Sequence, residues 1–178
     1  MTIKSKNEIL ETFRDSSRRV ADWFSSVPTA DFFTRQAEVW SASDNLDHLS
    51  KAVKPVTLAM KMPRLALQGM FGKPEKASRD YAEICETYRA ALAKGAQASG
   101  RYLPDQENPG AQADELKNQL IEKWKKVSDE LVAAAETWSE AELDEYQLPH
   151  PILGNLTVRE MLFFSIYHSL RHASIEGD

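Results

Sequence analysis

Residues 157–175 read TVREMLFFSIYHSLRHASI, and this segment carries the clearest structural signals in the chain. Thr157, followed three residues later by Glu160, is the capping-box pattern of a helix start, so we expect a helix from about residue 158 to 175. Steps of three and four place one stripe on a single face of this helix: Val158, Met161, Ser165, His168, His172 and Ile175. Two histidines on an inward-facing stripe need partners, because burying an unpaired polar group is unfavourable.

Outward from this segment, helical periodicity continues through most of the chain. It predicts a long helix over 6–26, a second that starts at an N-cap at Ser41 or Ser43, is kinked at Pro55 and is ended by Pro63, and a third over 113–138. Shorter helices are expected over 64–71 and 78–96, loops over 28–40 and 100–111, and a turn over 148–155. No run of alternating β-branched residues indicates a sheet. We therefore expect one all-α domain over residues 1–178, a bundle of four long helices with short additional ones.

The composition narrows the class of protein. The chain has 178 residues, and 22 Lys and Arg face 27 Asp and Glu, for a net charge of -5. This balance argues against a nucleic-acid binder and against a basic membrane-surface helix, while the longest apolar-rich stretch, 158–170, is too short and too polar to cross a bilayer. The single cysteine, Cys85, excludes an intrachain disulfide, suits a reducing compartment and is expected to be a small buried hydrophobe. We therefore expect a cytoplasmic protein.

The histidines are the main candidates for chemistry. His168 and His172 are four residues apart, so a helix places their Cβ atoms about 5–6 Å apart on one face, where both imidazoles can hold one metal ion. His48 is the candidate third ligand, because it lies beside the apolar seam of the second long helix. Three neutral imidazoles with an open fourth position make a catalytic metal site rather than a closed structural one. The row of His48 has short or small residues that leave room near the ring: Asn45, Ala52, Pro55 and Ala59.

Two stretches of the sequence resemble a known family. Residues 40–49 (WSASDNLDHL), with a histidine eight positions after the tryptophan, resemble the early signature of the DinB-like (DinB/YfiT-like) metalloenzyme superfamily. Residues 150–172 (HPILGNLTVREMLFFSIYHSLRH) resemble its later signature. The resemblance spans about residues 5–176, and its middle part includes residues 88–92 (YRAAL), Gly95 and Pro104.

The resemblance implies a fold and a ligand set. It implies a four-helix bundle with up-down-down-up topology, frequent homodimerisation, and a divalent metal held by His48, His168 and His172. Members with known activity include thiol-dependent transferases and isomerases that use bacillithiol, mycothiol or glutathione, so a low-molecular-weight thiol is an expected cofactor.

A metal with an open position lowers the pKa of the thiol or water that binds there. The leading hypothesis is therefore a metal-dependent, thiol-transferring enzyme acting on a small molecule. A metal-dependent hydrolase with the same ligands and a metal-free or metal-storing bundle acting through protein contacts are the alternatives. Imidazole ligands suit Zn, Ni and Fe(II) alike.

Further residues are candidates for supporting roles. Asp44 and Asp47 could orient the ligand imidazoles, or they could be solvated acids at a helix start. Arg171 could meet an acidic substrate at the site mouth, or form an outward-facing salt bridge. His150, in a proline-rich turn, is interpreted as a surface or turn-bracing residue.

The last helix is apolar nearly all round, which indicates either enclosure or a subunit contact. Its residues away from the histidine stripe predict a homodimer interface, the alternative being coverage by the 78–96 segment: Phe163, Ile166, Tyr167 and Leu170.

Overall fold

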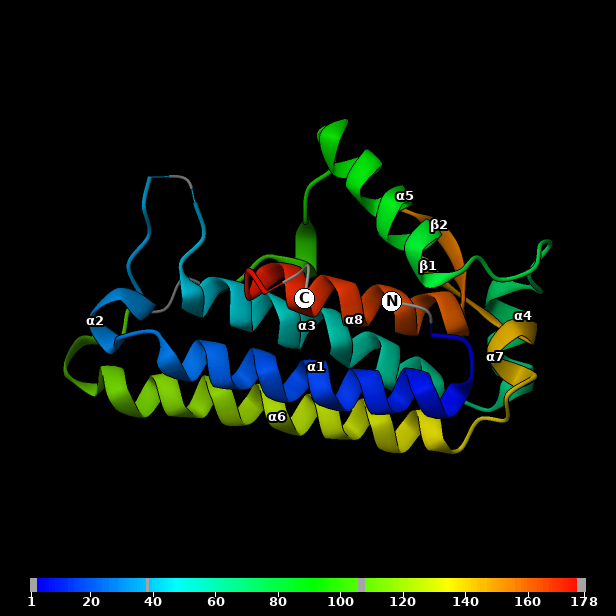
Figure 1. Ribbon diagram of the computed structural model, residues 1–178, viewed down its shortest axis with the longest axis horizontal. Coiled ribbons are helices and arrows are strands. Elements are labelled where there is room, and N and C mark those ends of the chain that lie inside the picture. Colours follow the sequence, from blue (N-terminus) through cyan, green and yellow to red (C-terminus); the bar gives the residue numbers. More distant parts are fainter. Residues whose placement is uncertain (1–2, 38, 106–107, 176–178) are drawn as a thin grey trace.

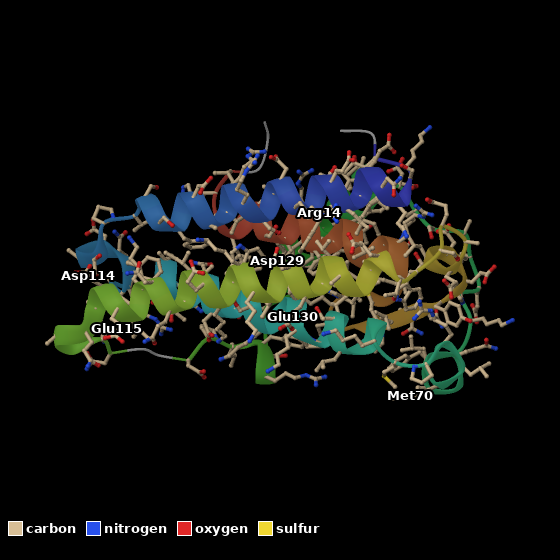
Figure 2. All side chains as sticks on the ribbon, turned by 90° about the horizontal axis from the view of Figure 1, so that it is seen from below. Arg14, Met70, Asp114, Glu115, Asp129 and Glu130 are labelled. Carbon is tan, nitrogen blue, oxygen red and sulfur yellow. The ribbon has the colours of Figure 1, made fainter. Side chains whose placement is uncertain are left out.

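The computed structural model describes residues 3–37, 39–105 and 108–175. Four long helices make its main body: α1 (Lys6–Ser26), α3 (Ala42–Met60), α6 (Ala113–Glu136) and α8 (Val158–His172). The helix α1 packs on α6 and α8, and α3 packs on the same two helices (Figure 1). Charged side chains such as Arg14, Glu115 and Asp129 lie on the exposed faces of α1 and α6 (Figure 2). The chain is thus mostly helical, as its periodicity predicts.

Short elements connect the long helices. They are the helices α2 (Thr29–Phe32), α4 (Arg64–Phe71), α5 (Tyr81–Ala93) and α7 (Glu142–Glu145), and the 3₁₀ turns η1 (Gly100–Tyr102) and η2 (Gly110–Gln112). Helix α4 has the predicted bounds, whereas α2 lies inside a segment expected to be a loop. In the part of the chain that the structure describes, no helix is long and apolar enough to cross a membrane.

A small β-hairpin corrects the expectation of a chain without a sheet. Strands β1 (Gln147–His150) and β2 (Gly154–Thr157) pair antiparallel, with His150 opposite Gly154, where a turn alone was predicted. Each strand has four residues, so the segment is too short for the alternation that identifies strands in a sequence. Gly154 has φ 73°, a left-handed conformation that glycine adopts without strain. The hairpin feeds directly into α8 and contacts α4 (Figure 1).

Local capping determines where the helices begin. Ser41, rather than Ser43, caps α3, and Thr157 caps α8 with Glu160 as its capping-box partner. Helix α5 starts after an Asp80 cap, and Ser78 instead hydrogen bonds Thr157 Oγ1 at 2.7 Å. The first turn of α8 is therefore tied to the segment that precedes α5.

Helix α8 lies in the interior of the fold, and every residue from 158 to 170 is buried. Helix α5 covers the face predicted to contact a second subunit (Figure 1). Tyr81 packs edge-on against Phe163 at 5.9 Å between ring centroids, and Arg89 Nε donates to Tyr167 Oη at 2.9 Å. The apolar character of α8 therefore follows from enclosure within one chain, which is the alternative to a subunit contact, and the homodimer stays a prediction.

The buried guanidinium of Arg159 holds the first turn of α8 in place. Arg159, which is only 8% exposed, donates to Asp144 at 2.7 Å, to Glu140 at 2.6 Å and to the carbonyl of Lys4 at 2.6 Å. A buried guanidinium needs partners of this kind. These bonds join α8 to α7 and to the segment before α1.

The α8 cap is expected to stabilise the fold more than a similar cap at the surface. Thr157→Ala should lower the free energy of unfolding by about 1–2 kcal/mol, because it removes the cap and leaves its buried partners unpaired. Ser5→Ala, the same kind of change at the more exposed capping box of α1, should lower it by about 0.5–1 kcal/mol. Urea unfolding followed by circular dichroism measures both, and equal effects would contradict a special role for the α8 cap.

Candidate metal centre

Three imidazoles from two helices meet inside the fold. His48 comes from α3, and His168 and His172 come from consecutive turns of α8. One nitrogen of each ring lies within 4.8 Å of the others, and His48 Nε2 is 3.1 Å from His168 Nε2. The structure thus brings together the three residues that the sequence singles out.

A backbone carbonyl orients the ring of His48. Nδ1 of His48 lies 2.6 Å from the carbonyl oxygen of Tyr102, which belongs to η1. A carbonyl only accepts, so Nδ1 carries the hydrogen and Nε2 keeps its lone pair. Nε2 of His48 therefore accepts the hydrogen bond from Nε2 of His168, and its lone pair is the one that could bind a metal.

The ring of His172 is oriented in the same way by Asn45. The amide nitrogen of Asn45 donates to the carbonyl of Ser41 at 2.9 Å, which leaves its oxygen to accept from His172 Nδ1 at 2.6 Å. Nε2 of His172 is therefore also free to bind a metal. Asn45 has no role in the sequence prediction beyond its place one turn before His48, in the same helical row.

Asp44 and Asp47 bond to groups other than the imidazoles, and both are buried rather than solvated. Asp44 accepts from the backbone of Ser41 in the capping box and from Arg35 at 2.6 Å. Asp47 accepts from Lys123 at 2.8 Å and forms an ion pair with Lys51 at 2.9 Å. The orienting bonds come instead from a neutral amide and a carbonyl. The pair of Asp47 with Lys51 follows from their spacing of four residues on one helix, whereas its bond to Lys123 comes from another helix and has no local sequence signal.

Burial keeps the three rings neutral. Desolvation lowers the pKa of His48, against the opposing effect of the hydrogen bond to Tyr102. Desolvation and the neighbouring His172 hold the pKa of His168 well below its usual range, and desolvation with His48 lowers the pKa of His172 to about 3. Neutral imidazoles are the form that binds metals.

The donor set fits a divalent transition metal. Two nitrogen ligands on a tetrahedral ion at about 2.0–2.1 Å lie roughly 3.3 Å apart, close to the separation of the two Nε2 atoms. Among the described residues the cluster contains no fourth His, Cys, Asp or Glu. A metal held by these three rings would therefore keep a position for another ligand, and nitrogen donors of this kind suit Zn, Ni and Fe(II).

Aromatic side chains hold the imidazoles in place. Trp40 packs against His48 at 4.9 Å and stacks on His172 at 6.0 Å between ring centroids. Phe164 stacks on His168 at 4.8 Å. These contacts restrict ring rotation and surround the cluster with apolar surface, which strengthens electrostatic interactions inside it.

A cavity of about 320 Å³ lies against the cluster, with His48 and His168 in its wall. Most of its lining is apolar, and α3 contributes Ala52, Pro55 and Ala59. These residues belong to the row of small side chains that was expected to leave room near His48. Pro55 sits within α3, which continues to Met60. A volume of this size suits a small molecule.

The remaining candidates lie around the site. Arg171 is exposed on α8 and does not line the cavity, although its charge contributes to lowering the pKa of His168 and His172. Cys85 is buried at 4% exposure and is also outside the cavity lining, which confirms its interpretation as a small buried residue.

Comparison with known proteins identifies the family. The family model of the DinB superfamily matches residues 12–175, which is most of the chain. Searches of curated proteins and of solved structures gave no match. The matched range contains all three clustered histidines and the elements that orient them, and on this basis the chain belongs to the DinB superfamily.

Proposed function

We propose that the protein is a metal-dependent enzyme that transfers a thiol to a small molecule. In this proposal His48, His168 and His172 hold one divalent ion, Zn, Ni or Fe. The observation that carries it is the meeting of three imidazoles, two buried and one partly buried, beside an apolar cavity. An orienting hydrogen bond at Nδ1 leaves the lone pair of two of these rings on Nε2. When bound, the metal would supply a Lewis acid that lowers the pKa of a thiol at its open position.

The chain itself binds, orients and excludes water. Tyr102 and Asn45 hold the rings of His48 and His172 in one tautomer, so these two rings need not rotate when the site is loaded. The apolar walls favour an apolar substrate and keep water from competing with the thiol. The thiol must come from outside the chain, because Cys85 is buried away from the cavity. This requirement supports a low-molecular-weight thiol as co-substrate.

The proposal extends to the whole protein. It takes residues 1–178 as one domain whose four long helices form an up-down-down-up bundle, in a cytoplasmic homodimer that binds neither nucleic acid nor membrane. Packing of α1 and α3 each against α6 and α8 supports the bundle, and the net charge of -5 supports the absence of nucleic acid. Arg171 is exposed and lies outside the cavity lining, so the proposal gives it no contact with the substrate.

Metal affinity should depend on Asn45 and be insensitive to Asp47. Asn45→Ala is expected to weaken zinc binding about 10- to 100-fold, because His172 loses the partner that orients it. Asp47→Asn should change the affinity less than about threefold, because Asp47 bonds to lysines rather than to imidazoles. Competition with a chromophoric chelator measures both constants. A larger effect of Asp47→Asn than of Asn45→Ala would contradict the assignment.

The pH at which metal binding weakens should be lower for this site than for three ordinary histidines. Each ligand must be neutral to bind the metal, and an ordinary imidazole takes up a proton near about pH 6.5. Because burial lowers all three pKa values, zinc affinity should be nearly constant from pH 8 to 6.5 and should fall only at lower pH. Chelator competition at a series of pH values tests this. A loss of about a thousandfold per pH unit beginning at 6.5, the signature of three ordinary imidazoles, would show the prediction to be wrong.

The stability of the metal-free protein should also decrease on acidification. A histidine whose pKa is lowered in the folded state binds fewer protons than in the unfolded chain, so the free energy of unfolding should decrease as pH falls below about 6.5. His172→Asn should reduce this slope, as measured by urea unfolding between pH 7 and 5. An unchanged slope in the variant would mean that His172 titrates normally.

The reaction is tested by separating thiol transfer from hydrolysis. Protein loaded with Zn, Ni or Fe(II) is mixed with 1-chloro-2,4-dinitrobenzene and glutathione, bacillithiol or mycothiol, and in parallel with 4-nitrophenyl acetate alone. We expect turnover that requires both thiol and metal and falls at least about 100-fold in His172→Ala. Metal-dependent ester hydrolysis without thiol turnover would favour a hydrolase. Less than about a tenth of an equivalent of metal in purified protein, unchanged by His172→Ala, would favour a non-catalytic bundle.

A further inference from the structure

A fourth histidine lies on the wall of the same cavity. His150 ends strand β1, and its Nδ1 accepts from the backbone nitrogens of Ile152 at 3.2 Å and Leu153 at 3.0 Å. This confirms that His150 braces its turn. An atom that accepts two N–H groups carries no hydrogen itself, so the neutral ring carries its hydrogen on Nε2. Burial lowers the pKa of His150 to about 4, and the ring is neutral at physiological pH.

The rest of the His150 ring belongs to the cavity. It packs edge-on against Phe164 at 4.3 Å between ring centroids, and Phe164 in turn stacks on His168. One aromatic ring thus separates His150 from the histidine cluster. Within the described ranges, Nε2 of His150 has no hydrogen-bond partner, although its residue lines the cavity. The Nε2–H group of His150 is therefore a hydrogen-bond donor available to a ligand in the apolar cavity.

Few other donors compete with His150 in the lining. Ser165 donates to the carbonyl of Met161 at 2.8 Å and is already satisfied. Gln97 and Ser99 are exposed, and so is Arg101, which carries the one positive charge among the described lining residues. The hydroxyl groups of Tyr88 and Tyr102 also belong to lining residues, and neither bonds to a residue in the described part of the chain. An apolar pocket with a few placed donors is the usual form of a small-molecule site.

We propose that His150 is a substrate-binding residue whose Nε2–H donates to the carbonyl oxygen of a compact, uncharged, apolar substrate. A neutral donor in an apolar wall pairs well with a neutral acceptor. A buried carboxylate would require a buried charged partner, and the one cation among the described lining residues, Arg101, is exposed. The role of this contact in catalysis rests on the proposed function. The contact itself does not involve the metal, so it can be tested on metal-free protein.

Two substitutions separate the two roles of His150. In His150→Asn the side-chain oxygen takes the place of Nδ1, so the turn keeps its acceptor while the Nε2 donor is lost. In His150→Gln the amide nitrogen reaches the place of Nε2, so the donor is kept while the brace is lost. Circular dichroism and thermal unfolding establish that each variant is folded.

The probes are acetophenone and α-methylstyrene, which have the same shape but differ by a carbonyl. Their dissociation constants are measured by ligand-detected NMR on chelator-treated wild type and variants. His150→Asn should weaken acetophenone about three- to tenfold and change α-methylstyrene less than twofold, and His150→Gln should retain the affinity for acetophenone within about twofold. In wild type, ¹⁵N-histidine spectra should show the Nε2–H tautomer for His150 and a shift of that signal with acetophenone alone.

Several outcomes would overturn the inference. These are absence of binding by either probe, equal losses for both probes in His150→Asn, an Nδ1–H tautomer, or a carbonyl-specific loss in Tyr88→Phe without one in His150→Asn. If His150→Gln does not fold, His150→Asn and the wild-type spectra still decide. Failure of the proposed metal site would appear separately, as a lack of zinc binding with the probe results unchanged.

Discussion

Burial of three imidazole rings against one another is the constraint on which the arrangement of the site depends. An imidazole has one donor and one acceptor, and neither is easily left without a partner in an apolar interior. The carbonyl of Tyr102 and the amide of Asn45 each take one donor, so the second nitrogens of His48 and His172 converge with that of His168. The tautomers, the low pKa values and the fitness for a metal all follow from this packing.

Charged residues near this centre are paired with partners other than the imidazoles. Asp44 and Asp47 pair with cations from outside α3, and Arg159 joins acids of α7, so each strong charge near the core is neutralised where it stands. The cavity can therefore be apolar up to the imidazoles. Small side chains of α3 create its volume, and the hairpin that precedes α8 adds His150 to its wall. A fold that was organised only by helix packing would have no such donor opposite the cluster.

Much of the fold was predictable because helix signals are local. Caps and apolar spacing located α1, α4 and the start of α8 within the chain, and the shared stripe identified His168 and His172 as inward-facing. The hairpin was missed because two four-residue strands carry no periodicity. The sequence leaves a subunit contact and coverage by residues 78–96 as two explanations for the outer face of α8, because it does not reveal that α5 packs back over this face. The roles of Asp47 and Asn45 depend on Lys123 and His172, which are far away in the chain.

The sequence by itself determined the helical class, the starts of α1, α4, α6 and α8 and the three candidate ligands, since these depend on residues within one or two turns of each other. Only the tertiary structure decided which groups orient the ligands, which face of α8 is covered and that His150 lines the cavity. Hydrogen bonds and packing between segments about 50 to 130 residues apart make these choices, such as His48 with Tyr102 and His172 with Asn45. Such contacts exist only after the chain has folded, because burial removes the water that would otherwise satisfy each polar group.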